Sequence, residues 1–145
     1  MKIEITHFKE NDRERLKLIY FEVRQTNFTW LSQESFNISS FDSDTEGESI
    51  LVAKVDNEIV GFTSVWLPEN FLHHLYVSNP FQGKGIGTLL LNSVIEMASS
   101  DITLKCLKKN KLGIKFYLKQ GWESVSEGES NEGRYVLFRY QVTKN

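Results

Sequence analysis

The chain has 145 residues, of which 40% are hydrophobic, and its formal net charge is −2. This length suits a single domain, and a chain so rich in apolar residues forms a packed core rather than a disordered segment. The near-neutral charge gives no field that would attract nucleic acid or an anionic membrane. A single cysteine, Cys106, excludes an intrachain disulfide framework and a cysteine-based zinc cluster.

Two further features indicate the compartment. No apolar run approaches the length of a membrane span, and the first residues contain no apolar signal-peptide block. Cys106 lies within an apolar run, which predicts a buried structural thiol. We therefore expect a soluble cytoplasmic protein with one domain over residues 1–145.

The first half of the chain alternates strand-like and helical patterns. Residues 2–6 alternate as a strand, and a helix follows a cap at Asn11 or Asp12. Its apolar positions have helical spacing and are Leu16, Ile19, Tyr20 and Val23. Residues 27–36 have no clean period and predict a short helix or a structured loop. Residues 49–54 and 58–66, joined by the turn Asp56–Asn57, predict a β-hairpin.

The second half continues this alternation. Residues 71–77 and 102–107 predict strands, and a helix between them ends near Ser99–Ser100. Its predicted apolar face consists of Ile86, Leu89, Leu90, Val94 and Met97. Residues 112–119 predict a short helix ended by Gly121, and residues 122–126 and 134–142 predict the last strands. Together these elements predict a mixed α/β (α+β) domain, in which a sheet is flanked by helices.

The segment "NPFQGKGIGTLL", residues 79–90, joins a strand to a helix and has glycines at three alternate positions. A helix N-terminus exposes unpaired N–H groups and carries partial positive charge, so it binds phosphate when small residues let the anion approach. Side chains at Gly83, Gly85 and Gly87 would block that approach, and Lys84 can add a charged hydrogen bond. A tight turn without a ligand needs fewer glycines, so we favour a phosphate site.

Spacing eliminates the two commonest nucleotide loops. The GxxxxGK[S/T] pattern of nucleoside-triphosphate loops does not occur here. The GxGxxG pattern of dinucleotide loops fails because its third glycine would fall on Thr88 or on Leu90.

The same residues resemble a third pattern. Gln82-Gly83-Lys84-Gly85-Ile86-Gly87 resembles the Q/R-x-x-G-x-G/A acetyl-CoA-binding element of the GNAT superfamily of N-acetyltransferases. Asn110, Gly113, Phe116-Tyr117 and Gly121-Trp122 resemble the N-x-x-A-x-x-F-Y-x-x-x-G-F element of that family, with glycine for alanine and tryptophan for phenylalanine. The resemblance extends over residues 3–142 and implies the GNAT fold, with a twisted, mostly antiparallel mixed sheet flanked by helices.

The resemblance implies where acetyl-CoA binds. The backbone of the strand that enters the loop would pair with the pantetheine arm at Leu75, Tyr76 and Val77. The loop amides would hold the pyrophosphate, at Gln82, Gly83, Lys84, Gly85, Ile86, Gly87 and Thr88. Asn110 matches a position that often contacts the cofactor, and some of the six lysines of residues 105–119 would meet the 3′-phosphate side, although most of them suit a solvated helix face.

Tyr117 matches the position that commonly acts as general acid in this family. Attack of an amine on the thioester expels a thiolate, which a phenol within hydrogen-bond distance can protonate. The alternative is that Tyr117 only packs beside Phe116 in the core.

The amine must also lose a proton, and His73 is the candidate base because an imidazole titrates near neutral pH. Strand alternation places Phe71, His73, Leu75 and Val77 on one face, and Leu72, His74 and Tyr76 on the other. His74 and a water chain remain alternative bases. The sequence contains no metal-ligand cluster by spacing, so we expect no metal.

The implied activity is transfer of an acetyl group to a primary amine of a small molecule or a protein, by direct attack in a ternary complex. The rivals are a CoA-binding sensor or scaffold without turnover and a nucleotide-binding domain of another fold. Phe28, Trp30 and Phe36 either line the substrate pocket or complete the core. The acidic residues of the stretch 42–48 either attract a cationic amine or form a solvated loop. Homodimers are frequent in this family, and the sequence does not decide the oligomeric state.

Overall fold

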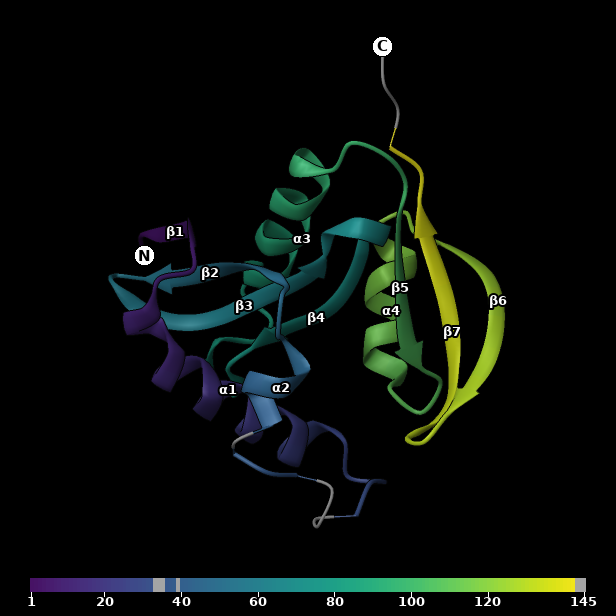
Figure 1. The fold of residues 1–145 in the computed structure, drawn as a ribbon, viewed down its shortest axis with the longest axis horizontal. Coiled ribbons are helices and arrows are strands. Elements are labelled where there is room, and N and C mark those ends of the chain that lie inside the picture. The colour runs from purple at the N-terminus through teal and green to yellow at the C-terminus, as the bar shows by residue number, and fades with distance from the viewer. Residues whose placement is uncertain (33–35, 39, 143–145) are drawn as a thin grey trace.

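The computed structural model describes residues 1–32, 36–38 and 40–142 (Figure 1). In the described part of the chain, the strands are β1 (Ile3–His7), β2 (Ser49–Val55), β3 (Glu58–Trp66), β4 (Phe71–Val77), β5 (Ile102–Leu107), β6 (Glu123–Ser130) and β7 (Gly133–Tyr140). The α-helices are α1 (Arg13–Asn27), α2 (Ser40–Asp44), α3 (Ile86–Met97) and α4 (Lys111–Lys119). The predicted mixed sheet flanked by helices is confirmed.

One sheet joins these strands in the order β1-β2-β3-β4-β5-β7-β6. Neighbouring strands are antiparallel except β4 and β5, which are parallel and pair at Phe71–Thr103 and Leu72–Leu104. A parallel pair needs a crossover connection, and α3 supplies it. Figure 1 shows β1–β4 and β5–β7 as two groups of strands on opposite sides of the view, which meet at the start of β4.

The helices cover both faces of the sheet. On one face, the predicted apolar side of α1 packs with Phe41 of α2 against Val52 and Phe62. On the other face, Ile86 and Leu90 of α3 pack against Ala53, Val55 and Val60. A larger hydrophobic cluster connects the two groups of strands. It contains Leu91 and Val94 of α3 together with Leu104 of β5 and Phe138 of β7.

Several sequence predictions need correction. The buried face of α3 uses Leu91, whereas Leu89 and Met97 are 42% and 52% exposed. Asp12 precedes α1, but its carboxylate accepts a hydrogen bond from the N–H of Lys9 (2.9 Å) and does not cap the helix. Helix α2 was not predicted, and β6 extends to Ser130. No helix continues over residues 28–32, whereas residues 33–35 of the predicted segment lie outside the described part of the chain.

Candidate functional site

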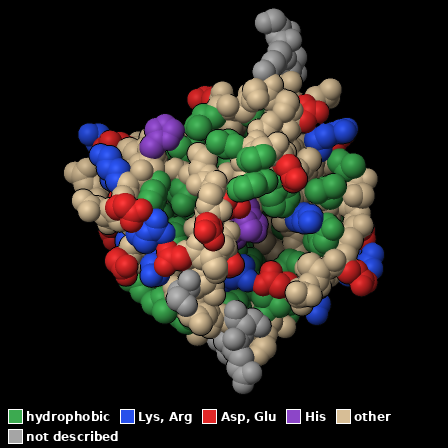
Figure 2. Space-filling model, viewed as in Figure 1, with side chains coloured by type: hydrophobic (Ala, Val, Ile, Leu, Met, Phe, Trp, Pro, Cys, Tyr) green, Lys and Arg blue, Asp and Glu red, His purple; other side chains and the backbone are tan. Residues whose placement is uncertain are grey.

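Strands β4 and β5 diverge after their first paired positions, and the space between them is a pocket. Its volume is about 300 Å³, and both strands line it, through His73, His74, Leu75 and Tyr76 on β4 and Lys105, Cys106 and Leu107 on β5. Figure 2 shows this hollow facing the viewer, with a histidine in it and acidic and basic side chains around it. Beyond Leu72, β4 has no pairing with β5, so this edge of its backbone is open to a ligand.

A β-bulge in β4 arranges the histidines. Ser64 of β3 lies opposite His74, and Val65 lies opposite Leu72, so His73 is an extra residue without a partner. At a bulge, consecutive side chains lose their alternation. The imidazoles of His73 and His74 are therefore stacked, with ring centroids 3.9 Å apart. The predicted alternation is wrong here: Leu72 shares the core cluster of Leu75, and His73 lies beside His74.

His73 is held by the carboxylate of Glu48, which the sequence analysis placed in the acidic stretch 42–48 without pairing it with a histidine. Glu48 Oε2 lies 2.8 Å from His73 Nδ1, and the Glu48 side chain is only 7% exposed. In the neutral imidazole, Nδ1–H donates to Glu48 and Nε2 keeps its lone pair. His73 is 41% exposed and faces the pocket, so this lone pair is accessible.

His74 has both ring nitrogens in buried hydrogen bonds. Nδ1 lies 2.7 Å from Ser64 Oγ, and Nε2 lies 3.4 Å from the hydroxyl of Tyr20. The Tyr20 hydroxyl donates to Asp44 Oδ2 (2.5 Å), so it accepts from Nε2–H, and Nδ1 accepts from Ser64. Burial, together with the neighbouring His73 imidazole and the charge of Arg24, lowers the pKa of His74 well below 6.5. A neutral His74 makes no ion pair with Glu48 Oε1, which lies 3.9 Å from Nδ1.

One group of side chains in the described residues could also hold a metal by distance. The potential ligand atoms of Glu48, His73 and His74 lie within 4.8 Å of one another. The sequence predicted no such cluster, because Glu48 and the histidines are far apart in the chain. Each Nδ1 already has a hydrogen-bond partner, Glu48 for His73 and Ser64 for His74. A metal at the two Nδ1 atoms would have to replace the proton that His73 shares with Glu48 and displace the Ser64 hydroxyl from His74, so the donor set suits proton transfer better than coordination.

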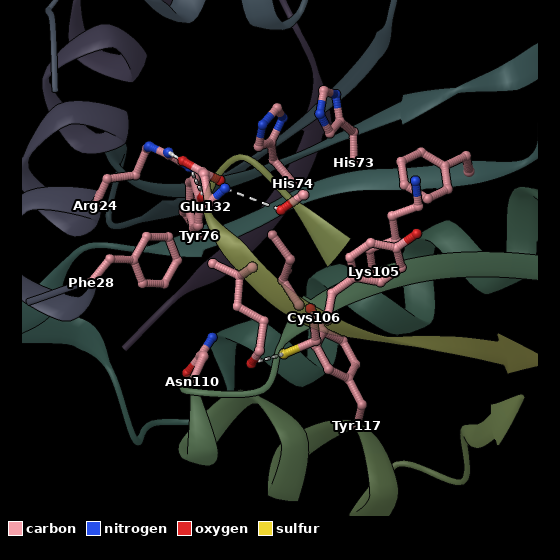
Figure 3. Close-up of a pocket in the computed structure, with 15 residues that line it drawn as sticks. Arg24, Phe28, His73, His74, Tyr76, Lys105, Cys106, Asn110, Tyr117 and Glu132 are labelled. Carbon is pink, nitrogen blue, oxygen red and sulfur yellow. Dashed lines mark hydrogen bonds and ion pairs between the residues drawn. The ribbon is translucent and has the colours of Figure 1, made fainter. Parts of the chain in front are cut away.

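Tyr117 of α4 and Cys106 of β5 line the other side of the pocket (Figure 3). In the described part of the chain, no hydrogen bond engages the Tyr117 hydroxyl, whose ring packs on Phe116, Trp122 and Phe138. Burial, with the nearby Cys106, raises the pKa of Tyr117. Burial likewise raises the pKa of Cys106 to about 12, which confirms the predicted buried thiol and disfavours a thiolate nucleophile.

The glycine loop opens to solvent beside the end of β4. Gly83 and Gly85 have φ angles of +77° and +85°, and an added Cβ on either would meet no atom within 4 Å. The first hydrogen bond of α3 runs from the N–H of Leu89 to the carbonyl of Gly85 (3.1 Å). The N–H groups of Ile86, Gly87 and Thr88 therefore have no partner within the helix and suit an anion.

Two predicted cofactor ligands use their side chains locally. The Gln82 amide donates to the carbonyl of Val77 (2.9 Å) and to Asn79 Oδ1 (3.0 Å), so it fixes the loop to the end of β4. Asn110 Oδ1 accepts from the N–H of Gly113 (3.1 Å) and caps α4. A Cβ on Gly113 would lie 2.6 Å from Asn110 Nδ2 and 3.0 Å from Cys106 Sγ, which accounts for glycine at this position. Asn110 still lines the pocket.

The lysines of residues 105–119 do not form one surface of free charge. Lys105 lies over the rings of Phe71 and Tyr135, at 5.8 and 4.9 Å from their centroids, and lines the pocket. Lys108 pairs with Glu127 (2.9 Å) on β6. These two lysines therefore have structural partners within the fold.

Arg24 of α1 is a pocket residue that the sequence analysis missed. Its guanidinium donates to the Tyr76 hydroxyl (3.0 Å) and pairs with Glu132, in the turn between β6 and β7. It also lies over the rings of Tyr20, Phe28 and Phe36. Phe28 is buried and lines the pocket, so it serves both the core and the site, whereas Trp30 packs on Phe28 outside the pocket. The one sequence signal for a role of Arg24 was its position four residues after Tyr20, which places both side chains on the same face of α1.

Among the described residues, no helix is long and apolar enough to span a membrane.

Comparison with solved structures shows the fold. The PaiA N-acetyltransferase of Thermoplasma acidophilum, in complex with coenzyme A, is 20% identical with a TM-score of 0.78, covering 97% of this chain and 99% of that one. YncA of Salmonella typhimurium, with acetyl-CoA, is 15% identical with a TM-score of 0.76, covering 99% and 95%. Arabidopsis thaliana Naa50, with the bisubstrate analogue CoA-Ac-MVNAL, is 21% identical with a TM-score of 0.75, covering 97% and 99%.

Comparison of sequences gives the family. No curated protein matches the chain significantly. The family model described as Acetyltransferase (GNAT) family matches residues 13–122. That range contains α1, the diverging strands, the glycine loop and Tyr117. The chain therefore belongs to the GNAT acetyltransferase family.

Proposed function

We propose that the protein transfers an acetyl group from acetyl-CoA to a primary amine, by direct attack of the amine in a ternary complex. The observation that carries the proposal is the divergence of β4 and β5, which leaves an open strand edge between a loop suited to phosphate and a pocket with ionisable side chains. Family membership and the CoA complexes of similar structures support it.

The residues of this chain fit acetyl-CoA at two places. The open edge of β4, at Leu75, Tyr76 and Val77, offers backbone groups to the pantetheine arm. The loop from Gln82 to Thr88 offers amide N–H groups to the pyrophosphate, and the absence of any atom near a Cβ at Gly83 or Gly85 leaves room for it. Acetyl-CoA supplies the thioester that makes the acetyl group reactive.

In this proposal, His73 is the base. Its Nε2 accepts the proton of the ammonium group, so that the amine gains a lone pair for attack. Glu48 holds Nδ1–H and stabilises the imidazolium that forms. His74 is unsuited to this role, because both of its nitrogens are engaged in buried hydrogen bonds.

Tyr117 is the acid in this proposal. Its hydroxyl has no hydrogen-bond partner among the described side chains, and its raised pKa keeps it protonated at neutral pH. It can therefore donate its proton to the sulfur that leaves as the acetyl group is transferred. Cys106, with a pKa of about 12, remains a neutral thiol and takes no part as nucleophile.

The test combines CoA calorimetry with an amine panel, in which release of free thiol and acetylated product is followed by mass spectrometry. We expect CoA to bind more tightly than ATP or NAD, and thiol release to depend on the added amine. CoA binding without turnover for any amine would favour the rival reading, a sensor or scaffold. Tighter binding of ATP or NAD would overturn the cofactor assignment.

A further inference from the structure

The charges of the pocket are separated into two ends. Arg24 lies at one end, His73 lies toward the other, and His74 lies between them (Figure 3). Glu48, whose side chain is 7% exposed, supports His73 from behind the pocket wall. Both Arg24 and His73 line the same hollow, together with Glu132. A ligand there meets a cation at one end and a base backed by a carboxylate at the other.

The Arg24 guanidinium is a buried cation in an aromatic setting. Its side chain is 14% exposed, and it lies 5.3 to 5.8 Å from the ring centroids of Tyr20, Phe28 and Phe36. Burial alone would lower the pKa of Arg24, but Tyr76, Tyr20 and Glu132 raise it, so the charge persists. A buried cation without an anion is costly, so Arg24 requires a carboxylate or an equivalent anion.

The present anion, Glu132, is replaceable. It belongs to the turn between two strands at the sheet edge, and its side chain is 39% exposed. Because the Glu132 carboxylate already lies partly in solvent, it can turn into water without first being desolvated, provided that another anion takes its place on Arg24. A carboxylate that enters the pocket can therefore take the place of Glu132 on Arg24.

Lys105 adds a second cation on the β5 side. It is exposed, it lines the pocket, and no ion pair engages it in the described part of the chain. Lys105 lies beside Phe71 toward the His73 end of the pocket, opposite Arg24 (Figure 3). A simple cationic amine would meet a like charge at each end, whereas an amine that also carries a carboxylate brings a negative group for these cations. Asp44, the other nearby acid, already accepts the hydrogen bond of the Tyr20 hydroxyl.

We infer that the acceptor is a zwitterionic amine of the amino-acid class, whose carboxylate displaces Glu132 from Arg24 while its amino group faces His73. This inference rests on the proposed acetyl transfer and names the substrate class of the same site. It makes Arg24 a specificity residue and Glu132 an internal competitor of the substrate carboxylate. As the C–N bond forms, the C–S bond of the thioester breaks: the ammonium group gives one proton to His73 before attack and a second to solvent as the amide forms, and the leaving thiolate takes the proton of Tyr117, which solvent then restores.

Paired acceptors that differ only in the carboxylate test the inference. L-phenylalanine against phenethylamine and L-lysine against cadaverine are compared as kcat/KM, in the wild type and in Arg24→Gln. We expect Arg24→Gln to lower kcat/KM roughly 10- to 100-fold for the carboxylated member, because a hydrogen-bonded charge pair is lost, and to change the decarboxylated member little. Comparing each amine across the two proteins cancels any difference in basicity.

Glu132→Gln gives a test that keeps the Arg24 side chain and removes only the charge of its partner. If Glu132 competes with the substrate, this variant lowers KM for the amino acid several-fold and leaves the decarboxylated amine unchanged. If Glu132 instead binds the ammonium group, KM rises for both, and the inference is wrong. Glu129→Gln is the matched control, because Glu129 lies on the same hairpin and pairs with Arg134.

Binding separates this inference from the proposed reaction. Calorimetry of L-phenylalanine and phenethylamine in the presence of CoA needs no turnover. Arg24-dependent binding of the amino acid without acetylation would support the zwitterion site and reject the transfer. Acetylation that favours the decarboxylated amines, or falls equally for both in Arg24→Gln, would support the transfer and reject the zwitterion site. A complete lack of amino-acid binding would also reject the zwitterion site.

Discussion

His73 and His74 show how the surroundings of a residue decide its chemistry. The two imidazoles are neighbours in sequence and stack face to face, yet His73 is half open to the pocket and His74 is buried. His74 has both nitrogens in hydrogen bonds that tie β3 to α1 and, through Tyr20, to α2. His73 shares one nitrogen with Glu48 and keeps the other available. His74 therefore suits a structural role, and His73 suits proton transfer.

The proton-accepting role of His73 predicts a change in pH dependence. His73→Ala should lower kcat/KM and remove the acidic limb that depends on this imidazole, while CoA affinity stays unchanged because the glycine loop is intact. Glu48→Gln should lower kcat/KM by about 10-fold, since the amide keeps a hydrogen-bonding group but loses the charge that stabilises the imidazolium. Rates are measured across roughly pH 5–9, a range that includes the titration of an ordinary imidazole. An unaltered acidic limb in His73→Ala would reject His73 as base.

The acid role of Tyr117 predicts a loss of rate without a loss of binding. Tyr117→Phe removes only a hydroxyl that no described side chain engages, so its thermal stability should stay near that of the wild type. Turnover should fall by about 10²-fold, which is typical when a positioned acid is removed. Single-turnover kinetics and CoA calorimetry provide the two measurements. A wild-type rate would remove Tyr117 from the mechanism.

At the scale of elements, the junction of the glycine loop with α3 separates two uses of glycine. Gly85 has a φ of +85°, which other residues adopt at a cost, whereas Gly87 lies in the first turn of α3, where a Cβ would meet Phe116 at an ordinary 3.6 Å. Gly85→Ala should lower the free energy of unfolding by about 1–2 kcal/mol. Gly87→Ala should raise it by about 0.5–1 kcal/mol. Urea unfolding of both variants measures these changes, and equal effects would contradict the loop geometry.

The phosphate role of the loop predicts a separate effect on CoA. Gly85→Glu projects a negative side chain into the open space beside the free N–H groups of α3. CoA affinity should fall by at least about 100-fold, because the carboxylate repels and replaces the pyrophosphate. Gly85→Ala has the same backbone strain without the charge, so it is the matched control in calorimetry. If Gly85→Glu binds CoA as tightly as Gly85→Ala does, the loop does not hold the pyrophosphate.

At the scale of the whole molecule, burial of a neutral histidine couples stability to pH. The pKa of His74 in the folded protein lies well below 6.5, so the unfolded chain binds more protons as the pH falls below about 6.5. Stability should therefore be constant above that value and decrease toward acid, by up to about 1.4 kcal/mol per pH unit from this group. Urea unfolding at several pH values between 5 and 8 measures the slope. His74→Gln should flatten it, whereas His7→Gln, at an exposed position on β1, should leave it unchanged.

Local patterns predicted the parts of the fold that depend on local physics. The helical spacing of Leu16, Ile19 and Val23 and the alternation of β2 gave correct elements, and the glycines gave the strand–loop–helix junction. What the sequence did not show depends on contacts between distant residues. Glu48 and His73 are 25 positions apart, and Arg24 and Glu132 are 108 positions apart.

Short elements and local irregularities were also missed, because their signals are weak. Helix α2 has only five residues, too few for a helical period to be recognised. The bulge at His73 depends on how β3 and β4 pair, and no feature of β4 alone reveals it. The consecutive histidines were visible in the sequence, but their stacking was not.

The bulge at His73 also determines how β4 tolerates insertions and deletions. Leu72 before the bulge and Leu75 after it both enter the core on the α3 side, although two residues lie between them, where regular alternation would require one. Deleting residue 73 would restore regular alternation with Leu72 still opposite Val65 and His74 still opposite Ser64, so both ends of the strand would keep their faces. Deleting a paired residue such as Leu75 would instead turn one end of the strand over. Residue 73 is therefore a position of this strand whose removal the sheet pairing can accommodate.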